Sequence, residues 1–260
     1  MSVQVSVIIP AYNEGQKIKA TLQKVTSYLK EKYPSYELIL VDDGSTDNTL
    51  EGARTAAALD PRIRLLSHSP NRGKGYSVKR GMRESTGKWV LFTDADLSTP
   101  IEELSRLMEY GMRGYRVVIG SRALPQSRIT VHQPFPRTAL GKCFNLAVRL
   151  LAVPRVRDTQ CGFKLFWGET ARLLASLGRL NRYSFDVELL FLARKMGLEV
   201  IEVPVQWAHR PGSKVKPWRD GLHMLADLAA IRWLEARGAY RTGVSLAEAI
   251  EPAARTVFKR

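Results

Sequence analysis

Acidic and polar side chains follow four of the short apolar segments in this sequence. Pro10-Ala11-Tyr12-Asn13-Glu14 follows the first segment, and Asp42-Asp43-Gly44-Ser45 follows the second. Thr93-Asp94-Ala95-Asp96 and Gly120-Ser121-Arg122 follow two later ones. Because ligands of open parallel sheets bind outside the carboxyl ends of the strands, four such ends predict a single cleft.

Asp94 and Asp96 have the pattern of ligands for a hard cation, because they stand two residues apart directly after an apolar segment. Capping of the next helix does not explain them, since Thr99, Pro100 and Glu102 already have the spacing of a cap, a first-turn proline and a capping-box glutamate. Such cations are typically held by one or two carboxylates together with substrate phosphates. We therefore expect Asp94 and Asp96 to bind Mg²⁺ or Mn²⁺ and a diphosphate.

Two further loops give weaker signals. Ser45 or Asp47 can cap the helix that follows Asp42-Asp43, but a cap leaves this pair unexplained, and a carboxylate here can accept hydrogen bonds from a nucleobase or a ribose. Asn71-Arg72-Gly73-Lys74-Gly75 is a glycine-rich loop before a helix, or equally a surface turn. The loop lacks the Walker spacing, and the chain has no dinucleotide fingerprint, which argues against an ATPase or a dehydrogenase.

The elements that must position these residues alternate between strand and helix. We expect strands at residues 5–9, 37–41, 62–66, 89–92 and 116–119, and helices at 14–30 and from about residue 47. Strands separated by helical segments are typical of βαβ units, and near-continuous apolar strands indicate a sheet covered on both faces. Residues 185–207 predict a helix and then a strand, and a last helix is expected from about Trp218, with Pro217 in its first turn. The sequence thus predicts an α/β fold with a mostly parallel, Rossmann-like sheet.

The charge of the chain narrows its partners. The formal net charge is +15 and the pI is about 10.0, which favours nucleic acid, a phosphorylated substrate or an acidic membrane face. Residues 121–157 hold six arginines and one lysine but no Asp or Glu, so they carry +7 of that charge. A nucleic-acid-binding protein is a remote alternative, because no such motif occurs and aromatic residues are not interleaved with the basic ones. We expect no nucleic acid partner.

The sequence also predicts the cellular compartment. Two cysteines, Cys143 and Cys161, are too few for a disulfide framework. No apolar run approaches the ~18 residues that a membrane helix needs, and the N-terminus lacks the pattern of a signal peptide. We expect a cytoplasmic protein.

Taken together, these motifs resemble those of the family 2 glycosyltransferases with the GT-A fold. Further segments resemble the dolichyl-phosphate glucose and mannose synthase branch of that family, and the form of Asp158-Thr159-Gln160-Cys161-Gly162-Phe163-Lys164 is similar to the β-glucosyltransferases. The other segments are Gly120-Ser121-Arg122 and Phe185-Asp186-Val187-Glu188-Leu189-Leu190. The resemblance covers about residues 3–240 and implies inverting transfer of a hexose from a nucleotide sugar to a polyprenyl phosphate. Glucose from UDP-glucose is favoured over mannose from GDP-mannose.

The resemblance also implies roles for individual residues. Those implied for the nucleoside pocket are Pro10, Tyr12, Glu14, Val41 and Asp43. Those implied for the metal and diphosphate are Lys74, Asp94, Ala95 and Asp96, and Arg122 is implied to meet phosphate. A basic pair after the last strand corresponds to Arg210 and Lys214, although the spacing is shorter than in mannose synthases. We expect a catalytic domain at residues 1–215, with a nucleotide-sugar half at 1–120 and an acceptor half at 121–215, and a C-terminal helical segment at 216–260.

The kind of acceptor decides which side chains the reaction needs. A hydroxyl acceptor, such as that of a polysaccharide, needs a carboxylate base, and Asp158 or Asp186 could serve. A phosphate monoester is already an anion and instead needs cations beside it, for which Arg122 and Arg137 are candidates. Asp186 and Glu188 then contact sugar hydroxyls or belong to an ordinary helix. Cys161 is expected to be a small packed residue.

Two helical segments are candidates for contact with an anionic membrane surface. Residues 138–152 are mostly apolar and place Lys142 and Arg149 on one face, and Leu222, Leu225, Leu228 and Ala229 form an apolar stripe on a second helix. Both helices can alternatively pack on the core. The eukaryotic glucose synthases that the chain resembles carry an N-terminal membrane segment, which is missing from this sequence. We therefore expect the C-terminal amphipathic helices to lie at the interface and the protein to be attached to the membrane peripherally or through another protein.

Overall fold

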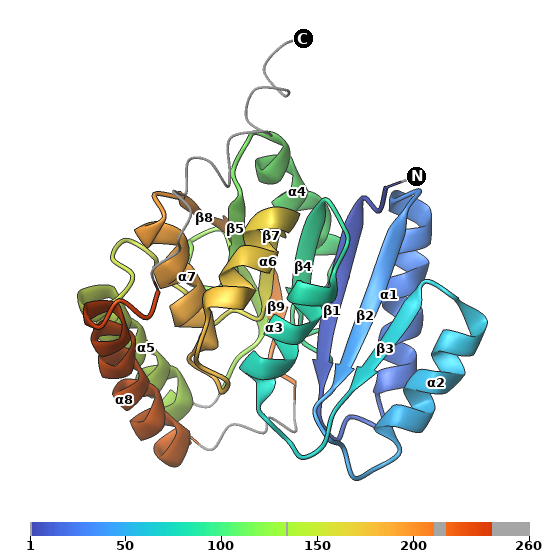
Figure 1. The fold of residues 1–260 in the computed structure, drawn as a ribbon, viewed down its shortest axis with the longest axis horizontal. Coiled ribbons are helices and arrows are strands. Elements are labelled where there is room, and N and C mark those ends of the chain that lie inside the picture. The colour runs from blue at the N-terminus through green and yellow to red at the C-terminus, as the bar shows by residue number, and fades with distance from the viewer. Residues whose placement is uncertain (1, 134, 211–216, 241–260) are drawn as a thin grey trace.

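A mixed seven-stranded sheet forms the centre of the part of the chain that the computed structural model describes (Figure 1). Described are residues 2–133, 135–210 and 217–240, with the backbone alone at 135–139, 142 and 217–219. The strand order is β3-β2-β1-β4-β7-β5-β8, and only β7 runs antiparallel to its neighbours. A separate parallel pair joins β6 and β9.

The bounds of the elements follow the chain. The strands are β1 (Val5–Ala11), β2 (Tyr36–Asp42), β3 (Ile63–Ser67), β4 (Trp89–Thr93), β5 (Val117–Ser121), β6 (Arg128–Val131), β7 (Phe163–Trp167), β8 (Val200–Pro204) and β9 (Gln206–Ala208). The helices are α1 (Ile18–Lys32), α2 (Thr49–Leu59), α3 (Lys74–Glu84), α4 (Leu104–Met112), α5 (Phe135–Leu151), α6 (Gly168–Leu177), α7 (Phe185–Lys195) and α8 (Pro217–Ala236). A short 3₁₀ turn, Ile101–Glu103, precedes α4.

Helices cover both faces of the sheet. Successive residues of a strand point to opposite faces, so each strand contributes side chains to two cores. Val7 and Ile9 pack in a core with α1, α2 and α4, whereas Ile8 packs in a second core with α3, α6 and α7. The sheet is therefore the middle layer of three, and the mostly parallel, Rossmann-like α/β fold predicted from the sequence is confirmed.

The five strands expected in the first 120 residues are confirmed, each within two residues of its predicted ends. The helix predicted from residue 14 begins later, at Ile18. The pattern gave no prediction of β6 or α6, nor of β7, which lies between β4 and β5 in the middle of the sheet.

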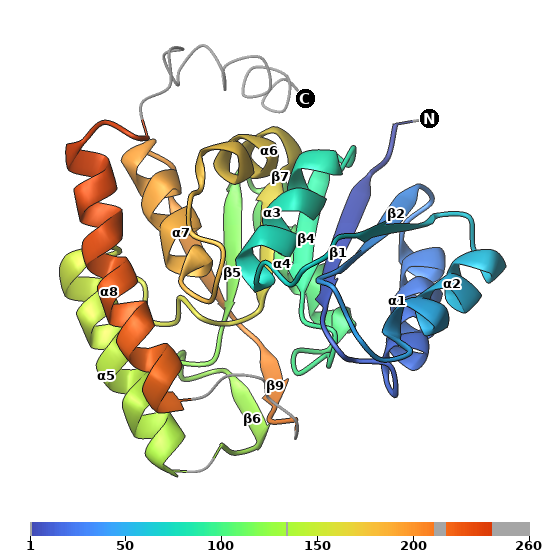
Figure 2. The ribbon, with the colours of Figure 1, turned by 60° about the horizontal axis from the view of Figure 1, so that its bottom comes forward.

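Helices α5 and α8 lie side by side at one end of the molecule (Figure 2). Of the apolar stripe on α8, Leu228 is fully buried and packs on the core, which was one of the two alternatives, while Leu222 and Leu225 are 71% and 46% exposed. On α5, Leu146 and Leu150 are exposed. Among the described residues, no helix combines the length and apolar character that crossing a membrane requires.

Candidate active site

The carboxyl ends of β1, β2, β4 and β5 lie at the same edge of the sheet. β1 pairs in parallel with both β2 and β4. β7 is antiparallel to β4 and also to β5, so β5 runs in the direction of β4. The four polar segments that the sequence analysis selected therefore meet at one edge, as expected.

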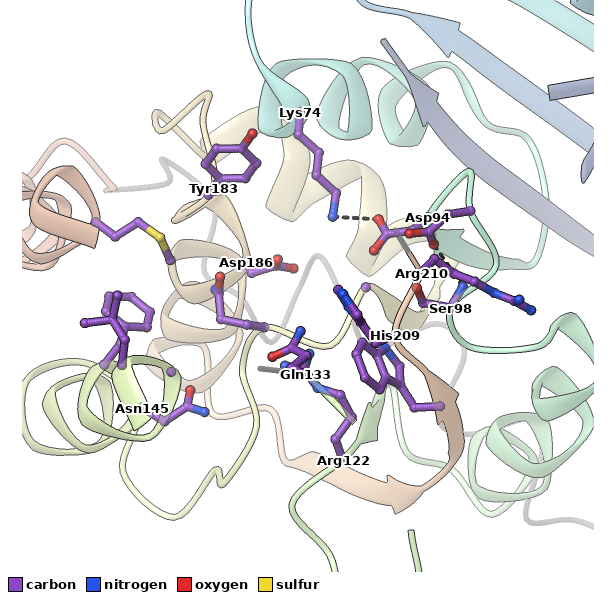
Figure 3. A pocket seen from close by; sticks show the side chains of 18 of the residues that line it. Lys74, Asp94, Ser98, Arg122, Gln133, Asn145, Tyr183, Asp186, His209 and Arg210 are labelled. Atoms are coloured by element: carbon purple, nitrogen blue, oxygen red, sulfur yellow. Dashed lines mark hydrogen bonds and ion pairs between the residues drawn. The ribbon is translucent and has the colours of Figure 1, made fainter. Parts of the chain in front are cut away.

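A pocket of about 260 Å³ opens at this edge (Figure 3). Of the residues predicted from the sequence, those that line it are Lys74, Asp94, Asp96, Arg122, Asp186 and Arg210. Its opposite wall comes from α5 and α8, with Leu140, Phe144 and Met224 among its lining residues. One pocket thus has a charged end at the sheet and an apolar end between two helices.

Asp94 and Lys74 form an ion pair inside the pocket, with 2.6 Å between Asp94 Oδ1 and Lys74 Nζ (Figure 3). Asp94 directly follows β4, and Lys74 is the first residue of α3. Burial lowers the pKa of Lys74, but Asp94 and Asp186 outweigh it, and the net effect is a raised pKa. Lys74 is therefore a fixed positive charge against the predicted diphosphate site.

Asp96 lines the same pocket. Its Oδ1 accepts a hydrogen bond of 2.9 Å from the backbone N–H of Ser98, which folds the loop after β4 into a tight turn. Burial and the neighbouring Asp94 raise the pKa of Asp96. Two carboxylates that repel each other in a partly desolvated site favour a bound cation.

The expected cap at Thr99 is wrong. Pro100 is the residue that precedes the 3₁₀ turn, and it makes no side-chain cap. The Thr99 hydroxyl instead contacts Cys161 Sγ at 3.8 Å, because the loop tucks against β7. The assignment of Asp94 and Asp96 to the site now depends on their place in the pocket and no longer on the cap.

Gly162 allows the Asp94 carboxylate to occupy its position. A Cβ atom at residue 162 would lie 2.1 Å from Asp94 Oδ2, far inside contact distance. Residue 162 directly precedes β7, the strand that pairs with β4. Any side chain here would displace Asp94, so the glycine is part of the site.

The donor set fits a hard divalent cation. Asp94 and Asp96 supply carboxylate oxygens, and the described residues contain no cluster of three or more His, Cys, Asp or Glu that could hold a metal by itself. An ion such as Mg²⁺ commonly takes its remaining ligands from substrate phosphates and water. Two carboxylates beside Lys74 are therefore a suitable place for a metal that arrives with a diphosphate.

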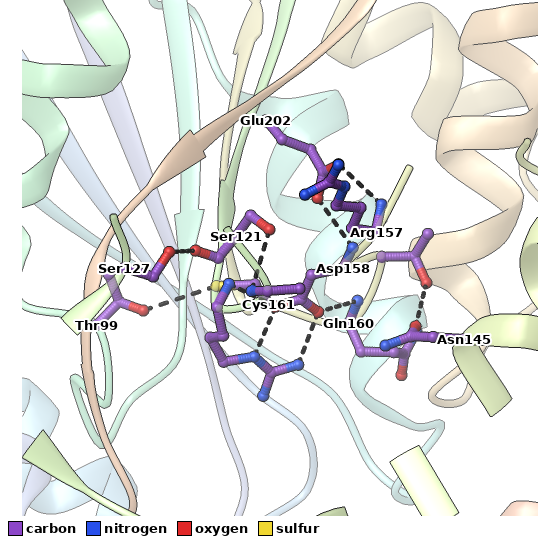
Figure 4. A network of polar contacts seen from close by, with 12 residues as sticks. Thr99, Ser121, Ser127, Asn145, Arg157, Asp158, Gln160, Cys161 and Glu202 are labelled. Carbon is purple, nitrogen blue, oxygen red and sulfur yellow. Dashed lines mark hydrogen bonds and ion pairs between the residues drawn. The ribbon is translucent and has the colours of Figure 1, made fainter. Parts of the chain in front are cut away.

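Arg122, which lines the pocket (Figure 3), forms a bidentate pair with Asp158. Figure 4 shows the polar network around Asp158. Arg122 Nε donates to Asp158 Oδ2 at 2.7 Å, and Nη2 donates to Oδ1 at 2.8 Å. The Arg122 backbone N–H also donates to Oδ2, at 2.8 Å. Burial opposes ionisation of Asp158, but Arg122 outweighs it and lowers the pKa of the carboxyl. The cation that was expected to meet a phosphate is therefore already oriented by a buried partner.

The segment around Asp158 is fixed by a second carboxylate. Glu202 on β8 accepts hydrogen bonds from the backbone N–H groups of Arg157 and Asp158, at 2.8 and 2.9 Å. Asp158 in turn accepts a 3.2 Å bond from the backbone of Gln160, which lines the pocket. Sequence reasoning named Asp158 only as a possible base, and no local signal linked it to Arg122, 36 residues away.

Lys164 and Asp186 form a second buried pair behind the pocket. Lys164 Nζ donates to Asp186 Oδ1 at 2.6 Å and to the Cys161 carbonyl at 2.5 Å, and Lys164 is fully buried in β7. Burial outweighs the opposing effect of the Lys164 ammonium, so the net effect is a raised pKa of Asp186. Burial also raises the pKa of the Cys161 thiol to about 11, so Cys161 is a packed thiol, as predicted.

Asp43 holds the glycine-rich loop. Its carboxylate accepts bonds from the backbone of Arg72 at 2.8 Å and of Gly73 at 3.0 Å, and His68 Nε2 lies 2.7 Å away. The side chain is buried. Asp43 therefore positions the loop that ends at Lys74, and its predicted contact with a nucleoside stays a prediction.

The other residues predicted for the nucleoside lie at the ends of β1 and β2, outside the lining of this pocket. Pro10 and Val41 are opposite each other in the parallel register and are buried. Tyr12 is 36% exposed just after β1. The Glu14 backbone N–H donates to Thr49 Oγ1 at 2.8 Å, which fixes the loop between β1 and α1.

Three further residues complete the predicted set. Ala95 is buried between the two aspartates, and its carbonyl accepts a 2.7 Å bond from Thr21. Arg137 falls within α5, but its side chain lies outside the described residues. Lys214 is outside them altogether.

Sequence reasoning missed several polar residues of the pocket. These are Ser98, Gln133, Asn145, Tyr183 and His209. They come from four separate segments of the chain and carry no spacing signal, so only the fold brings them together. Gln160 was part of a quoted motif but was given no role.

Comparison with solved structures supports the fold class defined by this sheet and its acidic edge. Glucosyl-3-phosphoglycerate synthase from Mycobacterium tuberculosis, solved with Mn²⁺, UDP and glucosyl-3-phosphoglycerate, superposes with a TM-score of 0.66. The match covers 93% of this chain and 82% of that one, at 22% identity. The fold is that of the GT-A glycosyltransferases.

The chain belongs to glycosyl transferase family 2, whose family model matches residues 6–166. Curated relatives extend the similarity beyond that range. Dolichyl-phosphate beta-glucosyltransferase of Dictyostelium discoideum is 38% identical over 244 residues, which are 89% of this chain and 75% of the relative. The human protein of the same name is 34% identical over 252 residues, covering 92% and 78%.

Proposed function

We propose that this chain is an inverting glucosyltransferase that moves glucose from UDP-glucose to a polyprenyl phosphate. The observation that carries the proposal is the make-up of the pocket, with paired carboxylates and cations at one end and two helices with apolar side chains at the other. The names of the relatives, which are 34–38% identical, support the same sugar and the same class of acceptor. Glucose is favoured over mannose for that reason.

The donor site lies at the Asp94 end of the pocket. Asp94 and Asp96 would hold a Mg²⁺ or Mn²⁺ ion, which supplies positive charge to the leaving diphosphate. Lys74, 2.6 Å from Asp94, is placed to contribute a second positive charge there. The use of Mn²⁺ with UDP-glucose by the structurally similar synthase is in keeping with this assignment. Pro10, Tyr12, Glu14, Val41 and Asp43 are proposed for the nucleoside.

The reaction is a single displacement at the anomeric carbon. An oxygen of the acceptor phosphate forms the bond to C1 of glucose while the bond from C1 to the diphosphate oxygen breaks, and that electron pair leaves with UDP. The configuration at C1 inverts. A phosphate monoester is largely dianionic at neutral pH, so no proton has to be removed from it.

The acceptor phosphate is proposed to lie near Arg122. Asp158 uses Nε and one hydrogen of Nη2, which leaves Nη1 for a phosphate oxygen. Arg210 lines the same pocket, and Arg137 and Lys214 are proposed to add charge. The main obstacle of the reaction is the repulsion between two anionic reactants, and these cations reduce it.

The pairing of the carboxylates argues against a hydroxyl acceptor. That chemistry needs a free base, yet Asp158 is bound by Arg122 and Asp186 by Lys164. Arg122 lowers the pKa of Asp158, so Asp158 is a weaker base than a free carboxylate. For Asp186, whose pKa burial raises, the argument is geometric, because a fully buried lysine already engages one of its two carboxylate oxygens.

The acceptor and membrane end is proposed to comprise α5 and α8. Leu146, Leu150, Leu222 and Leu225 are exposed on these helices, and so is Arg149. A basic and apolar surface of this kind suits peripheral binding at the cytoplasmic face of an anionic membrane. Residues 1–120 would then serve the donor, residues 121–215 the acceptor, and residues 216–260 the interface.

The test is to supply radiolabelled UDP-glucose and GDP-mannose separately, with a polyprenyl phosphate and Mg²⁺ or Mn²⁺, and to count the extracted lipid. Label from UDP-glucose in the lipid phase is the expected result. Label in the lipid phase from GDP-mannose alone would mean that the transferred sugar is mannose. Label found only in water-soluble products would mean that the acceptor is a hydroxyl compound and that no lipid phosphate is used.

A further inference from the structure

The apolar end of the pocket lies between the second and third turns of α5 and α8. Leu140, Gly141 and Phe144 of α5 line it on one side, and Gly221 and Met224 of α8 line it on the other. The same pocket holds Asp94 and Arg122 at its charged end. A ligand with an anionic head and an apolar chain therefore matches the pocket from end to end.

Gly141 and Gly221 lack the usual structural reason for a glycine inside a helix. Glycine is among the least favourable residues in a helix interior, so it normally indicates close packing. Gly81 and Gly111 show this, because a Cβ atom there would lie 2.4 Å from Ile8 and 2.7 Å from Trp89. Among the residues whose side chains the structure describes, a Cβ atom at Gly141 meets nothing within 4 Å.

Gly221 is similarly unconstrained. A Cβ atom there would lie 3.7 Å from Leu140 Cδ2, an ordinary van der Waals contact. Neither glycine is thus required by the packing of α5 against α8. What the two residues share is the pocket, which a longer side chain at either position would narrow.

The outer surface of α5 and α8, beyond the apolar end of the pocket, also carries apolar side chains. Leu222 is next to Gly221 in the sequence and is 71% exposed. On α5, Leu146 and Leu150 are exposed two and three turns beyond the start of the gap. An apolar chain that leaves the pocket between the helices would therefore meet further apolar side chains.

We propose that Gly141 and Gly221 keep open a subsite between α5 and α8 for the first isoprene units of the acceptor lipid. The inference depends on the proposed function, because the lipid is its acceptor. The phosphate lies at the Arg122 end, and the chain attached to it passes between the two glycines. The absent side chains set the width of the subsite.

The test measures transfer from UDP-glucose to a detergent-solubilised polyprenyl phosphate by Gly141→Ala, Gly141→Leu and Gly221→Leu. Detergent removes the contribution of membrane binding. We expect each leucine to raise the KM for the lipid tenfold or more, and the alanine to have a smaller effect. The affinity for UDP with Mn²⁺, measured by calorimetry, should stay within twofold of wild type.

Two readouts separate this role from a structural one. The Tm of Gly141→Leu should equal or exceed that of wild type, because leucine is the better helix former. Ala236→Leu, which adds the same kind of bulk at an exposed position at the far end of α8, should leave the KM for the lipid unchanged. A fall in Tm with a parallel loss of UDP binding would mean that the glycines serve packing and would overturn the inference.

The wild-type reaction tests the proposed function separately. If wild type glucosylates the lipid and both leucine variants do so with an unchanged KM, the subsite is wrong and the proposed function stands. If wild type transfers glucose to no polyprenyl phosphate while it still binds UDP, the proposed function fails and the subsite fails with it.

Discussion

Lys164 in β7 donates to Asp186 in α7 at 2.6 Å, and both side chains are buried. The pair joins the strand that was missing from the sequence prediction to a helix that lines the pocket. It holds Asp186 at the pocket wall with one carboxylate oxygen already engaged. Asp186 is thereby a fixed wall residue and a poor candidate for a mobile base.

Removing either partner of this pair should destabilise the fold more than removing both. Lys164→Met and Asp186→Asn each leave a buried polar group uncompensated, which typically costs about 3–5 kcal/mol in the free energy of unfolding. The double variant Lys164→Met/Asp186→Asn should lose less than either single variant. Urea unfolding of the four proteins measures this. Simple additivity would show that the pair contributes no coupling.

Gly162→Ala should weaken the donor site without unfolding the protein. The added Cβ atom would lie 2.1 Å from Asp94 Oδ2, so the carboxylate must move away. Loss of one charge-assisted contact costs about 1.5–3 kcal/mol, or roughly ten- to a hundredfold in affinity. Calorimetric titration with UDP in the presence of Mn²⁺ measures the loss, and circular dichroism checks the fold. If this variant bound UDP with wild-type affinity, the assignment of Asp94 to the donor site would be wrong.

The metal assignment predicts that Asp96→Asn lowers glucose transfer at least ~100-fold, because the leaving diphosphate loses its neutralising charge. Activity should be measured across a Mn²⁺ titration and in chelator. Glu51→Gln, on the exposed surface of α2, is the matched control and should behave as wild type. An Asp96→Asn enzyme that works at the wild-type rate in chelator would show that no metal is needed at this position.

The strands at the carboxyl edge were predictable because their signals are local. Each is a short apolar run followed by polar residues, and buried parallel strands have that pattern. β7 is different, because Lys164 interrupts its apolar run and the strand inserts antiparallel between β4 and β5. A buried lysine needs an opposite charge there, and the carboxylate that supplies it, Asp186, lies 22 residues further along the chain.

The same limit applies to the candidate site: its local patterns could be predicted from the sequence, and its long-range contacts could not. Asp94 and Asp96 were found because two carboxylates at a strand end form a local pattern. The pairing of Arg122 with Asp158 was not found, because it depends on the path of the chain between residues 122 and 158. Whether Leu228 meets a membrane or the core was left open, because helical spacing alone does not show which face of α8 is buried.

The acid stability of the fold should depend on Glu37. Burial raises the pKa of Glu37, but hydrogen bonds from Ser6, Thr86 and Arg64 outweigh it and hold the pKa below its usual range. The unfolded chain, with a glutamate pKa of about 4.3, therefore binds more protons near that pH than the folded one. This contribution to stability is present above about pH 4.3 and is lost as the pH falls toward the folded pKa. Urea midpoints at pH 7, 5 and 3.5 should fall more steeply for wild type than for Glu37→Gln, and equal slopes would exclude the role.

Binding to membranes should depend on charge at the α5–α8 end of the molecule. A basic residue near an anionic surface contributes about 1 kcal/mol, or roughly fivefold in binding, and salt screens it. Arg149→Gln on α5 should therefore bind vesicles of anionic lipid about fivefold more weakly than wild type. Salt at about 0.5 M shortens the Debye length to about 4 Å and should release both proteins from the vesicles. Arg54→Gln, exposed on α2 at the opposite end in Figure 1, is the matched control and should bind as wild type. Equal binding of wild type to neutral and anionic vesicles would exclude electrostatic docking, and resistance to salt would indicate insertion of Leu222 and Leu225 instead.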